Sequence, residues 1–113
     1  MADTDRKQLF HPASQVIFEE EFTDSVFLGC FSHKVYLVIK QRTLYIYNSK
    51  SDYESCPAFP KLFFNLNHMT CTLEEDHIEI SNRFVKVQLT HDDDNEILNL
   101  NEAIKKGRVS MGP

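Results

Sequence analysis

The sequence predicts a mainly β domain, in which a seven-stranded antiparallel meander forms a partly open barrel or sandwich capped by one C-terminal α-helix. Closely spaced runs of β-branched and aromatic residues fill most of the chain, and several of them alternate apolar with polar residues. Only the last segment changes to a helical period. The chain has 113 residues, 42% of them hydrophobic, which suits one compact core.

The first three predicted strands follow one another closely. They are Val26–Phe31 (VFLGCF), Lys34–Lys40 (KVYLVIK) and Thr43–Ser49 (TLYIYNS). Ser32 and His33 are expected to form the first connection, and Gln41 and Arg42 the centre of the second. Connections this short predict antiparallel pairing, because parallel strands need long crossovers.

The segment before these strands, Gln15–Phe22 (QVIFEEEF), fits either a short strand or an ordered lead-in. We assign residues 1–22 to a polar and acidic lead-in, residues 23–107 to the domain and residues 108–113 to a C-terminal tail. The acidic triplet lies between Phe18 and Phe22, which suits docking onto a basic partner surface. A solvated edge is the alternative.

The polar segment Lys50–Pro60 contains two prolines and is expected to be the one long loop. Four more predicted strands follow it: Lys61–Asn67, Met69–Glu75, His77–Ser81 and Arg83–Thr90. The last two alternate between apolar and polar residues, as strands with one buried and one wet face do. Ser81 and Asn82 suit a two-residue turn, since Asn tolerates positive φ.

The last segment predicts an amphipathic helix. Its apolar positions at helical spacing are Ile97, Leu100, Ala103 and Ile104. Asp92–Asp94 suit the positive end of the helix dipole, and Lys105 and Lys106 suit the negative end. Gly107 is expected to end the helix.

This order of elements resembles the pleckstrin homology (PH) superfold. In that family, strands like VFLGCF, KVYLVIK and TLYIYNS precede further strands, a last strand like RFVKVQLT and a capping helix like DNEILNLNEAIKKG. The resemblance covers roughly Thr23 to Lys106. The family's usual Trp in the helix is missing, since the chain has no Trp, and Leu98 or Leu100 would occupy that region. Phosphotyrosine-binding-like domains are the alternative.

The resemblance implies a non-catalytic module that recruits its host protein to protein partners or to phosphoinositide membranes. Lipid-binding members carry several Lys and Arg residues from the end of the first strand into the second, because cations must converge on clustered phosphates. The matching residues 30–36 include only one His and one Lys. A weak anionic site is expected from His33, Lys34, Lys50 and Arg83, with Lys61 as a further candidate. Solvated loop charges are the alternative.

Two functional classes follow. The favoured one is a protein-interaction module in signalling, trafficking or cytoskeletal assembly. Its expected contact residues are Phe18, Glu19, Glu20, Glu21, Tyr53 and Phe59. The second is a peripheral phosphoinositide-binding module of modest affinity.

Other functions are disfavoured by charge and residue spacing. The net charge of −5 opposes binding to a nucleic-acid backbone. We expect no catalytic residue, metal or cofactor: His68, Cys71 and His77 match no zinc spacing, and Cys30 with His33 lacks an orienting carboxylate.

The chain is expected to be a cytoplasmic monomer. Its three cysteines are an odd number without metal-ligand spacing, which indicates reduced thiols. No apolar run approaches the ~18 residues of a membrane span, and Ala2 replaces the Gly needed for N-myristoylation. Any membrane contact would therefore be peripheral.

Overall fold

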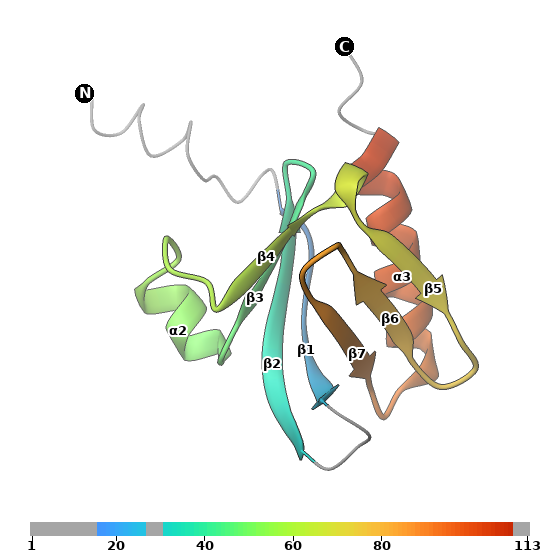
Figure 1. Cartoon of the computed structure of the whole chain (residues 1–113). Helices are drawn as coiled ribbons and strands as arrows, with labels where there is room; N and C mark the ends of the chain where they lie inside the picture. The colour runs from blue at the N-terminus through green and yellow to red at the C-terminus, as the bar shows by residue number, and fades with distance from the viewer. Residues whose placement is uncertain (1–15, 27–30, 110–113) are drawn as a thin grey trace.

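The structure, a computed structural model, describes residues 16–26 and 31–109. Its strands are β1 (Val16–Val26), β2 (Phe31–Lys40), β3 (Thr43–Tyr47), β4 (Leu62–Asn65), β5 (Thr70–Leu73), β6 (Ile78–Ser81) and β7 (Lys86–Thr90) (Figure 1). Its helices are α2 (Lys50–Ser55), the 3-10 helix η2 (Leu66–His68) and α3 (Asp94–Val109). The predicted seven strands and C-terminal helix are confirmed.

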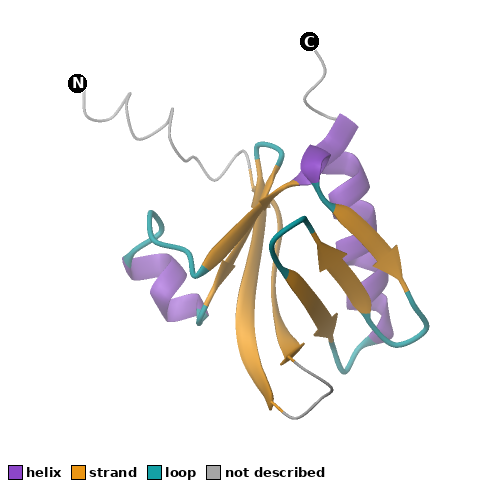
Figure 2. Ribbon diagram, viewed as in Figure 1, coloured by secondary structure: helices purple, strands orange, loops and turns teal. Residues whose placement is uncertain are grey.

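The strands form one antiparallel sheet in the order β4-β3-β2-β1-β7-β6-β5. β1 joins the two halves of this sheet, but unequally. It pairs with β2 from Val16 to Val26, whereas it pairs with β7 only at Thr23 and Asp24. Figure 2 shows α3 on the side of the molecule opposite to α2.

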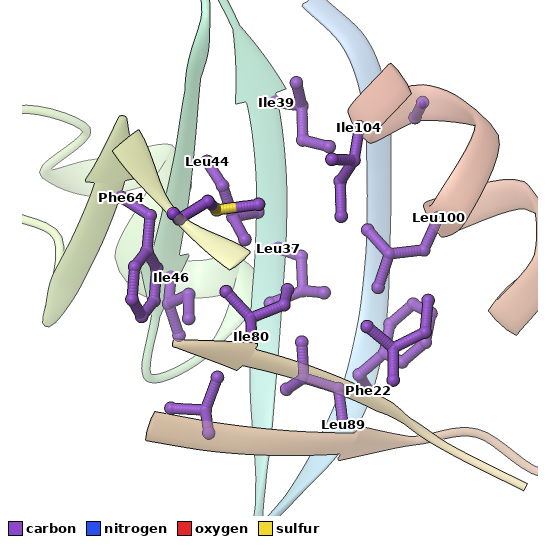
Figure 3. Close-up of a cluster of buried hydrophobic side chains, with 14 of the residues drawn as sticks. Phe22, Leu37, Ile39, Leu44, Ile46, Phe64, Ile80, Leu89, Leu100 and Ile104 are labelled. Atoms are coloured by element: carbon purple, nitrogen blue, oxygen red, sulfur yellow. The ribbon is translucent and has the colours of Figure 1, made fainter. Parts of the chain in front are cut away.

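The core lies between the two halves of the sheet and α3. Alternate residues of β2, Val35, Leu37 and Ile39, are fully buried there. Figure 3 shows side chains from both halves and from α3 pointing into this interior: Phe22, Leu37, Ile39, Leu44, Ile46, Phe64, Ile80, Leu89, Leu100 and Ile104. The apolar helical positions predicted from the sequence are buried. Leu100 is the core residue, whereas Leu98 is 51% exposed.

The outer face of the first half-sheet carries a second, aromatic cluster. All four tyrosines of the chain belong to it, Tyr36 and Tyr47 as buried members and Tyr45 and Tyr53 packed against them. The Tyr36 hydroxyl donates to Glu19 at 2.6 Å, and the Tyr47 hydroxyl donates to the Pro57 carbonyl at 2.6 Å. Burial raises the pKa of Tyr47 to about 12. Each buried tyrosine ring thus keeps a hydrogen-bond partner for its hydroxyl, as buried tyrosines usually do.

The prediction of one long loop at Lys50–Pro60 is wrong in its first half, which forms α2. The Ser49 side chain caps this helix by accepting the Asp52 N–H at 3.0 Å. Tyr53 then fixes the helix to the sheet by stacking on Tyr36, with ring centroids 5.6 Å apart.

The predicted first strand, Val26–Phe31, falls mostly on residues 27–30, which lie outside the described residues, and its two end residues belong to different strands that pair with each other. β1 ends at Val26, and Phe31 already begins β2, so Ser32 and His33 lie within a strand. Cys30 lies outside the described residues. β1 begins at Val16, so of the two alternatives for Gln15–Phe22 the structure has the strand. The acidic triplet has partners there: Glu19 binds Tyr36, Glu20 binds His91 and Glu21 pairs with Lys34.

The end of α3 differs from the prediction as well. The helix continues past Gly107 to Val109, and Gly107 is buried. A Cβ atom at this position would collide with the Leu66 side chain. Arg108 then donates to the carbonyls of Leu66 at 2.7 Å and Met69 at 3.0 Å. The glycine thus permits close packing of α3 on η2 instead of ending the helix.

The predicted capping at the start of α3 is confirmed by Asp93, whose side chain accepts the Asn95 N–H at 2.9 Å. The predicted turn between the second and third strands is confirmed too. Gln41 and Arg42 form it with φ values of 52° and 67°. This turn is at the top of Figure 1, whereas β1 ends and β2 begins at the bottom.

Candidate functional site

The end of the sheet where β1 stops and β2 starts, hereafter the β1–β2 end, brings three ionisable side chains together. Asp24 and His33 lie opposite each other in the strand register. The His33 Nε2 atom is 3.9 Å from Asp24 Oδ2 and 2.6 Å from Lys61 Nζ. Because a lysine ammonium can only donate, Nε2 accepts this hydrogen bond.

Asp24 is the buried member of this group. It is 5% exposed, and its Oδ1 atom has no hydrogen-bond partner among the described residues. Burial raises the pKa of Asp24 above the ordinary carboxyl value, although His33 and Lys61 oppose the shift. When ionised, the carboxylate cancels positive charge at this end of the sheet. The sequence prediction missed Asp24 because it fell outside the predicted strands.

Lys34 does not join His33, although the two are adjacent in the sequence. Successive residues of a strand face opposite sides of the sheet. His33 shares the inner face with Val35, whereas Lys34 lies on the outer face, where its Nζ is 3.9 Å from Glu21 Oε1. A shallow groove of about 200 Å³ beside Lys34 is also lined by Glu20, Glu21 and Asp92. Carboxylates thus outnumber the single lysine there.

The other two residues of the predicted anionic site lie elsewhere. Lys50 is the first residue of α2, and Arg83 follows β6, with its guanidinium 5.9 Å from the ring centre of Phe84. Within the described part of the chain, neither forms a hydrogen bond or ion pair with His33 or Lys34. Lys61 is the candidate that does reach His33.

A larger groove separates β1 from α3. It has a volume of about 400 Å³ and includes three of the predicted partner residues, Phe18, Glu19 and Glu20. From α3 it is lined by Glu96, Asn99, Glu102, Ala103 and Lys106. The β1 wall of this groove could be predicted from the sequence, because the acidic triplet marked it as a partner-binding segment. The helix half was not predicted, because its polar residues resemble any solvated helix face.

The remaining predicted partner residues have different surroundings. Glu21 faces Lys34 on the outer face. Tyr53 is half-buried between Tyr36 and Tyr47, so its ring holds α2 in place. Phe59, which follows α2, is 78% exposed.

Metal-binding and reactive groups give no further site in the described residues. Across residues 16–26 and 31–109, no three His, Cys, Asp or Glu side chains gather in a way that could hold a metal ion. Burial raises the pKa of the Cys71 thiol, which disfavours the reactive thiolate. No helix in the described part is long and apolar enough to cross a membrane.

Comparison with solved structures gives the class of fold. The chain is similar to the PH domain of human TBC1 domain family member 2, with 13% identity, a TM-score of 0.67 and coverage of 85% of each chain. It is similar to the C-terminal PH domain of pleckstrin in complex with D-myo-Ins(1,2,3,4,5)P5, with 17% identity and a TM-score of 0.61, covering 81% of this chain and 97% of that one.

A third structure, the linker and DH/PH domains of p115-RhoGEF, gives a TM-score of 0.68 at 13% identity. That match covers 97% of this chain and 33% of the other. No family model matches the sequence, and no curated protein matches it. The chain therefore has the PH-domain fold, and the resemblance noted in the sequence is confirmed at the level of the fold.

Proposed function

We propose that this chain is a non-catalytic PH-like module that recruits its host protein to protein partners in signalling, trafficking or cytoskeletal assembly. The observation that supports this function over lipid binding is the charge arrangement at the β1–β2 end. Binding of clustered phosphates requires cations that converge on one point. Here the buried Asp24 lies beneath His33 and Lys61, and Lys34 is directed to the other face of the sheet.

The second candidate is a peripheral phosphoinositide-binding module that uses His33, Lys34, Lys50 and Arg83, with Lys61 beside His33. Two observations favour it. Lys61 Nζ lies 2.6 Å from His33 Nε2, which places a lysine beside one residue of the predicted lipid site. The similar pleckstrin domain was solved with an inositol pentakisphosphate, although its identity to this chain is only 17%.

Sedimentation with phosphoinositide-containing liposomes separates the two candidates. A protein-interaction module should sediment no more with these liposomes than with neutral ones at physiological salt. A Lys34→Glu variant, which removes the predicted cation on the outer face, should then behave as the unaltered chain does. Lys105→Glu, an exposed substitution on α3, makes the same change in net charge away from the predicted lipid site.

The lipid hypothesis predicts the opposite outcome. Liposome binding through cations should fall steeply with ionic strength, because salt screens exposed charges. Headgroup-specific binding that shows this salt dependence and is lost in Lys34→Glu would overturn the protein-interaction function. Binding that is unchanged in Lys34→Glu would reject the predicted lipid site.

A further inference from the structure

We propose that the groove between β1 and α3 binds a basic, extended segment of a partner protein, which pairs as an added strand with the open edge of β1. This inference rests on the proposed function, because it names the surface and the chemistry of the partner. It depends on three features of the groove: a strand edge, apolar residues on its walls and an excess of carboxylates.

The open strand edge comes from the unequal pairing of β1. One edge pairs with β2 from Val16 to Val26. On the other edge, β7 pairs only with Thr23 and Asp24. Residues 16–22 therefore present backbone N–H and C=O groups without a second strand in the described structure. Such an edge is a template for a strand from another chain.

The groove beside this edge has room for a short segment. Its volume of about 400 Å³ falls within the usual range of binding pockets. Ile17, 37% exposed, and Ala103 supply apolar surface on opposite walls. An extended segment directs alternate side chains to opposite sides, so an apolar side chain can face these residues while its neighbours face the polar rim.

The charge of the groove selects the chemistry of that segment. Four carboxylates line it, Glu19, Glu20, Glu96 and Glu102, against a single cation, Lys106, among the described lining residues. Glu102 is partly balanced by Lys105 at 3.6 Å. Within the described part of the chain, the Glu96 side chain has neither a hydrogen bond nor an ion pair. Carboxylates on both walls favour a segment rich in Lys or Arg.

The imidazole of His91 leaves the charge of Glu20 in place. His91 Nδ1 accepts the Asp93 N–H at 2.9 Å, so the ring proton of the neutral imidazole is on Nε2. Nε2 then donates to Glu20 Oε2 at 2.9 Å. This neutral donor orients the carboxylate without cancelling its charge, and it ties β1 to the start of α3 at one end of the groove.

A second copy of this chain is a poorer occupant than a basic segment. Pairing of two β1 edges would place one acidic triplet, Glu19–Glu21, near the other. Like charges facing each other across paired strands are destabilising. The net charge of −5 opposes self-association further. The carboxylates thus protect the edge from self-pairing while they favour a basic strand.

Fluorescence anisotropy with short labelled peptides tests the inference. The probe is a peptide in which Lys alternates with Val, and the control peptide replaces each Lys by Glu. We expect saturable binding of the Lys peptide alone. The double variant Glu96→Lys, Glu102→Lys should weaken this binding at least about tenfold, because it reverses the charge of the helix wall. The matched variant Glu54→Lys, Glu75→Lys makes the same change in net charge away from the groove and should bind as the unaltered chain does.

Two further peptides test the strand pairing. Each is the Lys peptide with alternate backbone nitrogens methylated, one on the odd and one on the even positions, which removes half of the backbone donors and keeps the charge. The peptide whose methyl groups lie on the edge that pairs with β1 should lose binding. Far-ultraviolet circular dichroism of each variant shows whether it remains folded. The inference is wrong if the Lys peptide does not bind, if both charge variants weaken binding equally, or if both methylated peptides bind unchanged.

Failure of this inference and failure of the proposed function give different results. The chain could show no binding to the Lys peptide and no salt-sensitive binding to phosphoinositide liposomes. This result would reject the groove as the binding surface but would still fit a protein-interaction module that uses another surface. Lys34-dependent liposome binding rejects the proposed function whatever the peptides do. Sedimentation velocity showing a dimer that competes with the Lys peptide would assign the edge to a second copy instead.

Discussion

At the residue scale, Asp24 has the least favourable surroundings of the ionisable groups at the β1–β2 end. Its carboxyl is buried beneath His33 and Lys61, and one oxygen has no hydrogen-bond partner among the described residues. Burial raises its pKa above the ordinary value of 3.8. The folded chain then binds more protons than the unfolded chain between that value and the raised one. The free energy of unfolding therefore falls as the pH rises through this window.

The substitution Asp24→Asn tests this effect. Asparagine has nearly the same shape and does not ionise, so we expect a higher melting temperature than that of the unaltered chain at pH 7. The difference should shrink as the pH falls below 3.8, where the carboxyl is protonated in both states. Thermal unfolding followed by circular dichroism across this range gives the measurement. An Asn variant that is less stable at pH 7 would show that Asp24 attracts His33 and Lys61 more strongly than burial penalises it.

The sequence predicted the residues of the site only in part. His33 and Lys34 were grouped because the first connection was placed at Ser32 and His33. Once β2 is known to begin at Phe31, their alternation assigns them to opposite faces. The error came from the strand boundary and not from the chemistry of the residues. Lys61, which the sequence offered only as a further candidate, is the residue that does reach His33, from a position 28 residues away.

At the scale of elements, the β2–β3 hairpin has turn residues that do not suit its geometry. Gln41 and Arg42 both have positive φ, as a two-residue type I′ turn requires. Non-glycine residues in this region each cost roughly 1–2 kcal/mol, except Asn and Asp, whose cost is smaller. The Arg42 carbonyl accepts the Leu66 N–H at 2.8 Å, so tertiary structure helps to hold the turn.

A turn of Asn followed by Gly should therefore stabilise the hairpin. We expect the double variant Gln41→Asn, Arg42→Gly to raise the free energy of unfolding by about 1 kcal/mol. Urea unfolding at constant pH measures this change. The reversed order, Gln41→Gly with Arg42→Asn, provides the control for loss of the original side chains. Destabilisation by both variants would show that contacts of those side chains outweigh the strain of the turn.

For the molecule as a whole, the order and type of the strands and helices could be predicted better than the residues at which they begin and end. The apolar–polar alternation of β6 and β7 and the helical spacing of α3 are local patterns, because each depends on residues close together in the sequence. The predicted buried faces of these three elements are confirmed. The sequence left the start of β1 open between a short strand and a lead-in, because three successive glutamates disfavour a strand by propensity. Their partners, Tyr36, His91 and Lys34, come from other parts of the chain. The β1–α3 groove has the same origin, since its walls are about eighty residues apart in sequence.

The distribution of charge over the whole molecule leads to a prediction about anion binding. If the buried Asp24 limits anion binding at the β1–β2 end, its removal should create affinity for soluble phosphates. We expect Asp24→Asn to bind inositol hexakisphosphate about tenfold more tightly than the unaltered chain, because one nearby negative charge no longer opposes His33 and Lys61. Isothermal titration calorimetry at fixed salt measures the affinities. Glu54→Gln, which removes an exposed carboxylate from α2, makes the same change in net charge. An equal gain in both variants would show that net charge alone governs the affinity, and no gain in either would show that His33 and Lys61 do not form an anion site even when Asp24 is neutral.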